Sequence, residues 1–489
     1  MSIVAPEYLL FFATATFIYY ATALRHRWAI LLIASCIFYM TYMPAYIFLL
    51  LFIISLNFGS AILMEQSNRR LRQVVFVLAI TLNLSVLILF KYFNFFTENI
   101  SLLANFLHWN YSVQILMVLV PVGLSFQIFQ SLSYIFEVYS QRWEAEKHIG
   151  LYALFTLFYP TLLSGPIERP QTLLKQFHEM PSFEYSNATH GLKRMAWGYF
   201  KKVIVADHLA VVVNQVYATP GDYHGLVLII ATVLFAYQIY YDFSGYSDIV
   251  IGAAQVMGFK LTNNFTRPYF SASITEFWQR WHISLSTWIR DYMYYPTARS
   301  LLALTHRKHP RSIQLIVSII VMGLVGLWHG ANWTFVIWGL LHGFYLGLEG
   351  WFRAKHFAIL SRLHLNQGVL NLFRVNLTFS CICFAWIFFR ANSITDSIYV
   401  VTHLGQGINQ PLIDIRRIFA MLSSRDWIVT ICGVVTVEIA DWLTSNKHRV
   451  TEMLELRPFW LRWAFYYTFI LIIIVFGKFA NSRFLYFQF

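Results

Sequence analysis

Long apolar runs separated by short polar connections dominate this sequence of 489 residues. A helix needs about 20 mainly apolar residues to cross the hydrocarbon core of a bilayer. Runs close to that length lie at 8–24, 29–44, 45–64, 73–91, 113–138, 190–217, 225–243, 312–328, 333–351, 371–390, 427–443 and 460–478. Charged residues make up 12% of the chain, whereas a soluble domain carries about 25%. The sequence therefore predicts an all-α polytopic membrane protein with about 11 to 13 transmembrane helices.

Two more apolar segments, 149–165 and 246–300, are interrupted by Gly, Pro and polar residues. Irregular backbone is tolerated at membrane depth only where protein surrounds it or it lines a wet cavity. We therefore expect re-entrant or buried helices in both segments. No connection is long enough for a separate soluble domain, so any chemistry must take place among the helices. We expect one integral-membrane domain over 1–489, with N-terminal helices in 1–140, a catalytic core in 141–351 and C-terminal helices in 352–489.

The net charge of +13 comes from Lys and Arg clusters that lie between the apolar runs. In a soluble protein such a charge would suggest nucleic acid binding, but cytoplasmic loops of membrane proteins also collect positive charge. Basic residues at Arg25–Arg27, Arg69–Arg72 and Arg142–Lys147 mark every second connection. We therefore expect the N-terminus outside, and the segments Arg169–Lys202 and Arg299–Arg311 in the cytoplasm. Topology explains the charge better than nucleic acid does.

Ionisable side chains enclosed by apolar sequence are the first candidates for function, because they are expensive inside a membrane and usually functional there. They are Glu168, Asp242, Asp248, Glu276, Arg280, His282, Arg290, Asp291 and His329. Each also has a structural interpretation. Glu276 and Arg280 are four residues apart and can form a helix ion pair. Asp242 and Asp248 can cap helices, or pair with Lys260, Arg267 or Arg280.

His329 stands apart from the other candidates. It lies in an apolar hairpin with no charged neighbour in sequence, and Gly326, Gly330 and Ala331 remove side-chain bulk around it. A substrate or another backbone can therefore approach closely. A buried, neutral imidazole can accept a proton, as a general base must. From its surroundings in sequence alone, a structural histidine in the core is an equal alternative.

His282 is the second candidate, and on a helix it shares a face with Ser286. A metal site is the rival interpretation of the two histidines. Neither H-E-x-x-H nor H-x-x-x-H occurs, so we expect no bound metal. Tryptophans surround both histidines in sequence and are expected to form cavity walls: Trp278, Trp281, Trp288, Trp328, Trp333 and Trp338. The candidate substrate or tunnel residues are Asp242, Asp248, Glu276, Arg280, Trp281, Ser286, Trp328 and Asn332.

Four stretches together resemble the membrane-bound O-acyltransferase family, and within it the bacterial branch that serves alginate O-acetylation. They are Pro121–Phe126, Leu163–Pro170, Tyr241–Asp248 leading to Ile274–Ser286, and Gly326–Gly330; the final residues Phe484–Phe489 also fit. The Trp-His-Ile-Ser-Leu-Ser and Leu-Trp-His-Gly blocks are long and unusual in composition, so chance explains them poorly. The resemblance covers nearly the whole chain.

The resemblance implies a helical fold around a central tunnel and an essential histidine, which falls on His329. The second polar position of the family falls on His282. It implies transfer of an acyl group from a cytoplasmic thioester, acetyl-coenzyme A or another, to a hydroxyl, with no resident cofactor. A basic inner face would attract such an anionic donor.

Three functions stay open at this point. The first is O-acetylation of an exopolysaccharide or cell-wall glycan from the bacterial inner membrane, with a periplasmic or extracellular acetyltransferase as partner. The second is D-alanyl transfer to teichoic acid from a carrier protein. The third, from another class, is a lipid or sugar transporter. Inverted repeats and paired broken helices would indicate the transporter, and the sequence shows neither.

Overall fold

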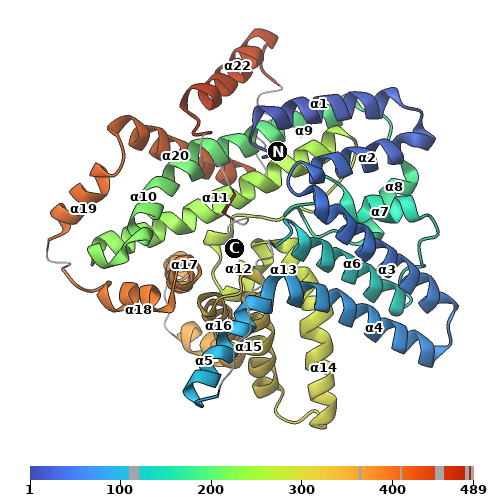
Figure 1. Ribbon diagram of the computed structural model, residues 1–489. Coiled ribbons are helices and arrows are strands. Elements are labelled where there is room, and N and C mark those ends of the chain that lie inside the picture. The colour runs from blue at the N-terminus through green and yellow to red at the C-terminus, as the bar shows by residue number, and fades with distance from the viewer. Residues whose placement is uncertain (110–119, 363–365, 408–409, 446–455, 480–483, 486–489) are drawn as a thin grey trace. The chain divides into compact units, whose positions relative to one another are not determined.

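The computed structural model describes residues 1–489 apart from 110–119, 363–365, 408–409, 446–455, 480–483 and 486–489 (Figure 1). Every regular element in the described residues is a helix, which confirms the all-α prediction. Contacts divide the chain into two compact units. Unit 1 comprises 1–192, 250–263 and 287–293, and unit 2 comprises 193–249, 264–286 and 294–489. The subdivision of a single domain at 140 and 351 stays a prediction.

Unit 1 is built mainly from eight helices of the N-terminal part of the chain. They are α1 (Pro6–Ala21), α2 (Arg27–Met40), α3 (Ile47–Gln66), α4 (Arg69–Leu87), α5 (Phe93–Phe106), α6 (Leu124–Tyr139), α7 (Ile149–Leu157) and α8 (Lys175–Glu179). Helix α3 packs against α4, α6 and α7, and α2 packs against α1 and α7. Because α6 is covered in this way, nearly all of its side chains are buried, polar ones included.

Four helical elements contribute residues to both units. They are α9 (Tyr185–Tyr199), α11 (Leu226–Val256), α13 (Ile283–Ile289) and the π-helical segment η8 (Arg290–Tyr294).

Unit 2 holds the remaining elements. They are the π-helical segment η5 (Phe200–Ala206), α10 (Asp207–Ala218), α12 (Ile274–Arg280), α14 (Tyr295–Leu304), α15 (Pro310–His329), α16 (Trp333–Arg362), α17 (Gln367–Arg390), α18 (Ile394–His403), α19 (Pro411–Ala420), α20 (Ser424–Ser445) and α22 (Phe459–Phe476). Helices α15 and α16 form a long antiparallel hairpin, and α12 and α17 both pack against α16.

Local sequence signals explain where the hairpin and its neighbours begin and end. Helix α15 starts with Pro310, whose missing N–H suits the first turn, and stops before Gly330. The Asn366 side chain accepts a hydrogen bond from the Gly368 N–H and caps α17. Ser393 caps α18 in the same manner, through the N–H of Asp396. The frame of unit 2 is therefore encoded by its helix ends as well as by its apolar runs.

Among the described residues, six helices are long and apolar enough to cross a membrane, or seven if the bent pair α19 and α20 is one span. The sequence predicted about 11 to 13. The two numbers differ because several apolar runs form shorter helices: α1 has 16 residues and α2 has 14. The polytopic, multi-pass character is confirmed.

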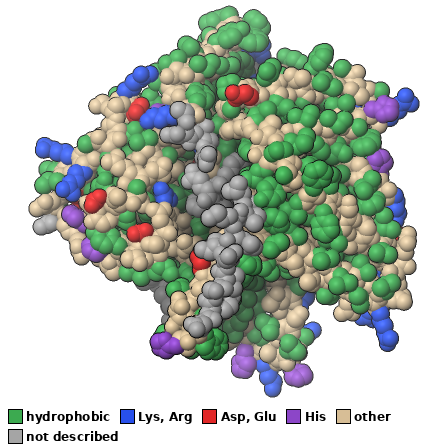
Figure 2. All heavy atoms as spheres, viewed as in Figure 1, with side chains coloured by type: hydrophobic (Ala, Val, Ile, Leu, Met, Phe, Trp, Pro, Cys, Tyr) green, Lys and Arg blue, Asp and Glu red, His purple; other side chains and the backbone are tan. Residues whose placement is uncertain are grey.

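Large apolar side chains lie on the surface as well as in the core. Figure 2 shows hydrophobic side chains over much of the visible face, with the Lys and Arg side chains mostly at its margins. Phe17 on α1 and Phe48 on α3 are 75% and 74% exposed. Exposed apolar surface on this scale suits lipid contact, and in water it would promote aggregation.

Candidate active site

His329 is the last residue of α15, and a short turn leads from it into α16. Its side chain is buried, and three aromatic rings contact the imidazole edge-on. The ring centroids lie 4.9 Å from Trp328, 5.0 Å from Trp338 and 5.4 Å from Phe389. The histidine that the sequence singled out is therefore enclosed by aromatic side chains inside unit 2.

Glycines let the two helices of the hairpin approach closely beside His329. A Cβ added at Gly326 would lie 2.1 Å from the carbonyl oxygen of Phe335, and one at Gly339 would lie 2.1 Å from that of Met322. At Gly330 the added Cβ would lie 2.2 Å from the Phe335 ring. Of the two expected reasons for these glycines, close packing of protein against protein is the one that the structure shows.

The helix expected through His282 is interrupted there, which is a correction to the predicted shared face with Ser286. Helix α12 ends at Arg280 and α13 begins at Ile283, and His282 between them has a φ of 42°. A residue with a Cβ rarely adopts this left-handed region, which costs roughly 1–2 kcal/mol. His282 is fully buried, and burial lowers its pKa to about 3, so its imidazole is neutral at pH 7.

Asn264 holds the break open by satisfying the first turn of α13. Its carbonyl oxygen accepts from the Ile283 N–H at 3.0 Å, and its side-chain oxygen accepts from the Ser284 N–H at 3.1 Å. The Thr266 N–H donates to the Arg280 carbonyl at 3.0 Å, on the other side of the break. These bonds satisfy groups that a continuous helix would have paired internally.

A series of aromatic contacts within unit 2 connects the surroundings of the two histidines. The Trp338 ring lies 5.8 Å from Trp386, which lies 5.3 Å from Trp281, the residue before His282. His282 itself contacts the Phe243 ring, with 4.7 Å between centroids. That Trp281 forms the wall of a cavity stays a prediction. That His282 faces His329 across a tunnel stays a prediction.

Two of the six predicted wall tryptophans lie elsewhere. Trp288 belongs to unit 1 and stacks on Phe129, with ring centroids 4.1 Å apart. Trp333, the first residue of α16, is 48% exposed. Trp278, Trp281, Trp328 and Trp338 are buried in unit 2. The tryptophan content of the motifs therefore reflects two separate cores and a helix end as well as the histidine surroundings.

Asp242 and Asp248, one and a half turns apart on α11, are held in buried ion pairs. Asp242 pairs with Lys202, and Asp248 pairs with Lys201 and with the Arg194 Nε at 2.9 Å. Both aspartates form ion pairs with basic residues, as expected. The expected partners, Lys260, Arg267 and Arg280, are wrong. Lys201 and Lys202 are 6% and 1% exposed, so they are not the open loop charges that the basic cluster suggested.

Phe484 and Leu485 contact the ion pair between Asp242 and Lys202. The Leu485 N–H donates to Asp242 at 2.9 Å, and the Phe484 ring lies 4.6 Å from the Lys202 ammonium. Both residues are buried. The sequence did not predict that Phe484 and Leu485 contact this ion pair. Two carboxylates in an apolar run require nearby cations. The adjacent Lys201 and Lys202 were the signal in the sequence that could have identified those cations.

Glu276 and Arg280 form the expected ion pair on α12, with about a third of each side chain exposed. Glu276 also completes a helix cap: its N–H donates to the Ser273 hydroxyl at 3.1 Å, and its carboxylate accepts from the Ala272 N–H at 2.7 Å. This reciprocal arrangement resembles a capping box. Glu276 therefore has a structural role that its spacing to Arg280 alone did not indicate.

Ser286 and Asn332, both predicted near the substrate, bond to backbone. The Ser286 hydroxyl donates to the Trp281 carbonyl at 2.9 Å. The Asn332 side-chain oxygen accepts from the Thr334 N–H at 3.0 Å at the start of α16. Both bonds fix the turns that carry the histidines.

Glu168, from the Gly-Pro stretch, lies in unit 1. It accepts from the Thr262 N–H at 2.6 Å and from the Thr172 hydroxyl at 2.9 Å. Burial raises the pKa of this carboxyl, and these hydrogen bonds oppose the shift. Its bonding ties two segments of unit 1 together, which is a structural role.

Comparison with known proteins now decides the family. The model of the membrane-bound O-acyltransferase family matches residues 67–388, a range that includes both histidines. The chain belongs to the membrane-bound O-acyltransferase family. It is an O-acyltransferase, as the resemblance of its motifs implied.

Named relatives of this acyltransferase fall into three groups. It is 34% identical over 392 residues to the probable alginate O-acetylase AlgI of Azotobacter vinelandii, covering 77% of this chain and 72% of the relative. It is 30% identical over 401 residues to the peptidoglycan O-acetyltransferase of Helicobacter pylori, covering 76% and 72%. The teichoic acid D-alanyltransferase of Bacillus subtilis is 27% identical over 275 residues, covering 55% and 68%.

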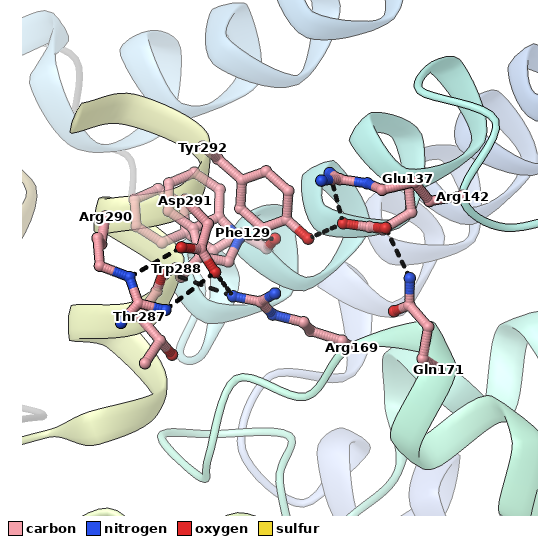
Figure 3. A network of polar contacts seen from close by, with 10 residues as sticks. All are labelled: Phe129, Glu137, Arg142, Arg169, Gln171, Thr287, Trp288, Arg290, Asp291 and Tyr292. Atoms are coloured by element: carbon pink, nitrogen blue, oxygen red, sulfur yellow. Dashed lines mark hydrogen bonds and ion pairs between the residues drawn. The ribbon is translucent and has the colours of Figure 1, made fainter. Parts of the chain in front are cut away.

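A second polar region of the acyltransferase lies in unit 1 and includes the predicted candidates Arg290 and Asp291 (Figure 3). Asp291 forms ion pairs with Arg169 and with the Arg290 Nε, the latter at 2.9 Å. The Trp288 indole N–H, which lies beside them, donates to the Phe129 carbonyl at 3.0 Å. These contacts join η8 to Arg169, directly before η4 (Pro170–Leu174), and join α13 to α6.

Glu137 is the centre of the other half of this region (Figure 3). Its carboxylate, 2% exposed, accepts from Arg142 at 2.9 Å, from the Gln171 amide at 2.6 Å and from the Tyr292 hydroxyl at 2.5 Å. We call the ten residues of Figure 3 the Glu137–Asp291 network. Its carboxylates are occupied by protein donors, so they serve the fold of unit 1.

Proposed function

We propose that this acyltransferase moves acetyl from a cytoplasmic thioester for the O-acetylation of an exopolysaccharide or a cell-wall glycan. The observation that carries the proposal is the enclosed imidazole of His329 at the end of α15, inside the range that matches the family. Relatives named alginate O-acetylase and peptidoglycan O-acetyltransferase support acetyl as the acyl group.

In the proposed reaction His329 acts as a general base. One imidazole nitrogen takes the proton of an acceptor hydroxyl while that oxygen bonds to the carbonyl carbon of the thioester. The C=O electron pair moves to the carbonyl oxygen and returns as the C–S bond breaks. The departing thiolate takes the proton from the imidazolium, so the imidazole is neutral again. The aromatic enclosure keeps out water that would hydrolyse the thioester.

His282 is proposed as the second site residue. Its left-handed backbone is an unfavourable conformation that the bonds to Asn264 maintain. Such strain persists where surrounding structure over-determines it and tends to cluster at functional sites. A neutral His282 imidazole can donate or accept one hydrogen bond without adding a charge to the site.

The proposed donor is acetyl-coenzyme A or another acyl thioester, and the proposed location is the bacterial cytoplasmic membrane. Thioester donors of this kind are anionic, and the chain carries a net charge of +13. The segments Arg169–Lys202 and Arg299–Arg311 are expected on the cytoplasmic side by the positive-inside rule. The buried ion pairs of Lys201 and Lys202 remove these two residues from the donor-attracting set.

A separate extracytoplasmic protein is proposed to deliver the acyl group to the polymer. The polar connections of the chain are too short to form a glycan-binding domain of their own. A cysteine in place of Lys308 that reacts with an impermeant reagent from outside intact cells would invert the sidedness.

D-alanyl transfer is the second candidate, because relatives named teichoic acid D-alanyltransferase match about half of the chain at 27% identity. Donor choice separates the two. Inside-out membrane vesicles that contain the chain are supplied with isotope-labelled acetyl-coenzyme A or with a labelled D-alanyl carrier protein. Base-labile label in the polymer fraction from acetyl-coenzyme A supports the proposal. Label from the D-alanyl carrier alone would replace acetyl by D-alanyl.

A further inference from the structure

Four buried ring nitrogens on three residues near His329 have no partner in the described part of the chain. His342 on α16 is 0% exposed, and neither its Nδ1 nor its Nε2 has a hydrogen-bond partner among the described residues. The indole nitrogens of Trp278 and Trp338, with side chains 9% and 1% exposed, also have none there. We call Trp278, Trp338 and His342 the Trp338 cluster.

The three rings contact one another directly. The His342 centroid lies 5.0 Å from Trp338 and 5.2 Å from Trp278, and the two indoles are 5.9 Å apart. All three residues belong to unit 2, on α12 and on the α16 half of the hairpin. The cluster is therefore one site and not three separate defects.

Trp338 places this cluster next to the proposed chemistry. Its ring lies 5.0 Å from His329 on one side and 5.0 Å from His342 on the other. Trp338 and His342 are one helical turn apart, so both side chains leave the same face of α16. The hairpin glycines Gly326 and Gly339 keep that face close to the end of α15.

The chemistry of the cluster defines what it can bind. Two indole N–H groups are donors only, and a neutral imidazole offers one donor and one acceptor. Buried polar groups in native proteins are normally satisfied, and those without protein partners often bind a ligand or ordered water. A cluster rich in N–H donors and without a carboxylate suits an oxygen that gains negative charge.

We propose that the Trp338 cluster binds the carbonyl oxygen of the acyl group during transfer, with Trp338 and His342 donating hydrogen bonds to it. The proposal rests on the proposed function, because it names where the oxygen goes when the acceptor attacks. As the C–O bond forms, the carbonyl electron pair moves onto this oxygen, and the N–H donors stabilise the charge. Preformed donors in a dry site are among the strongest contributions to catalysis.

Two substitutions remove the donors while keeping an apolar side chain at each position. Trp338→Phe keeps an aromatic ring without the N–H, and His342→Leu has a similar volume without either nitrogen. Each is expected to lower kcat for transfer from acetyl-coenzyme A by roughly 10- to 1,000-fold, with KM nearly unchanged, because the charge develops only in the transition state. His342→Gln, which keeps an N–H donor, is expected to recover part of the loss.

Thermal unfolding of the purified chain in detergent supplies a readout independent of activity. Since no described residue bonds to these nitrogens, His342→Leu is expected to leave the Tm unchanged or raise it. Trp338→Phe also removes part of a buried ring, so it is expected to lower the Tm by the cost of the cavity alone. Trp288→Phe is the matched control, because its indole N–H bonds to Phe129 within unit 1. It is expected to lower the Tm and leave kcat per folded molecule unchanged.

The outcomes separate the two proposals. Wild-type vesicles that transfer no acyl group would refute the proposed function and, with it, the carbonyl ligand. If the wild type transfers acetyl and both His342→Leu and Trp338→Phe retain that activity, the proposed function stands and the inference is overturned. That result is expected if water alone occupies the cluster. A large fall in Tm for His342→Leu would overturn it too, since the nitrogens would then serve the fold.

Discussion

The Glu137–Asp291 network and the Trp338 cluster both place polar groups in buried surroundings, but they differ in how those groups are satisfied. In the network, the Glu137 carboxylate receives three donors and Asp291 pairs with two arginines. In the Trp338 cluster, four ring nitrogens on three residues have no described partner. The contrast separates polar groups that hold the fold from groups whose partner arrives with the substrate.

The contrast also separates the two kinds of failure that a substitution causes. Removing one member of a satisfied network leaves its partners unpaired, so stability is lost. Removing a ring nitrogen from the unsatisfied cluster breaks no hydrogen bond to a described residue, so activity is lost while the fold remains.

His329→Ala is expected to lower acyl transfer by roughly 10²- to 10⁴-fold, the usual contribution of a general base. The protein should insert and fold normally, because the aromatic rings that enclose the imidazole stay in place. The measurement is polymer-bound acetate normalised to the membrane level of the protein. His108→Ala, at an exposed position of unit 1, is the control. Near wild-type acetylation by His329→Ala would refute the assignment of His329 as the general base.

Glu137→Ala is expected to destabilise unit 1 by about 3 kcal/mol, because the buried Tyr292 hydroxyl and the Gln171 amide lose their acceptor. Glu137→Gln keeps one acceptor oxygen and should cost less. Thermal unfolding in detergent measures both, and transfer per folded molecule should stay at the wild-type level. If Glu137→Gln were fully stable yet inactive, the Glu137–Asp291 network would belong to the active site. The distinction between groups that stabilise the fold and groups that bind the substrate would then fail.

Gly326→Ala is expected to lose roughly 1–3 kcal/mol of stability, since overpacking a tight contact forces backbone shifts. The added Cβ would lie 2.1 Å from a backbone oxygen of Phe335, which cannot rotate away. Gly323→Ala is the matched control on the same helix. Its Cβ would lie 3.1 Å from the flexible Leu340 side chain, and alanine favours the helix, so stability should hold or rise. Equal effects of both substitutions would contradict the close approach that positions the Trp338 cluster.

Much of the fold was predictable, because apolar runs and basic connections follow from the needs of a bilayer. The burial of both histidines was also predictable, from the apolar sequence around His282 and His329, and their roles in catalysis stay predictions. The break at His282 was not, because its left-handed backbone depends on Asn264, eighteen positions earlier. A local pattern cannot indicate a bond made by a distant side chain.

The partners of Asp242 and Asp248 illustrate the same limit. Their need for cations was evident, but the choice of Lys201, Lys202 and Arg194 depends on how α9 and η5 pack against α11. Gly198 and Gly245 permit that packing: a Cβ on either would lie 2.6 Å or 2.8 Å from the other's carbonyl oxygen. Pairing across helices is a tertiary property. The clusters of positive charge in the sequence therefore do not indicate which carboxylates their side chains contact.

The smallest expected effect tests a residue for which two interpretations stood side by side. Arg280 pairs with Glu276 on α12, where 34% and 31% of the two side chains are exposed. An exposed helix pair contributes about 0.3–0.5 kcal/mol, so Arg280→Ala should barely shift the Tm. Glu276 keeps its bond to the Ala272 N–H, so the α12 cap should survive. If Arg280→Ala instead lowered transfer more than about tenfold with an unchanged Tm, a transition-state contact worth 1.4 kcal/mol or more would be missing. Arg280 would then act on the substrate, as proposed for the Trp338 cluster. An ion pair with a neighbouring residue would no longer be enough to assign a side chain a structural role.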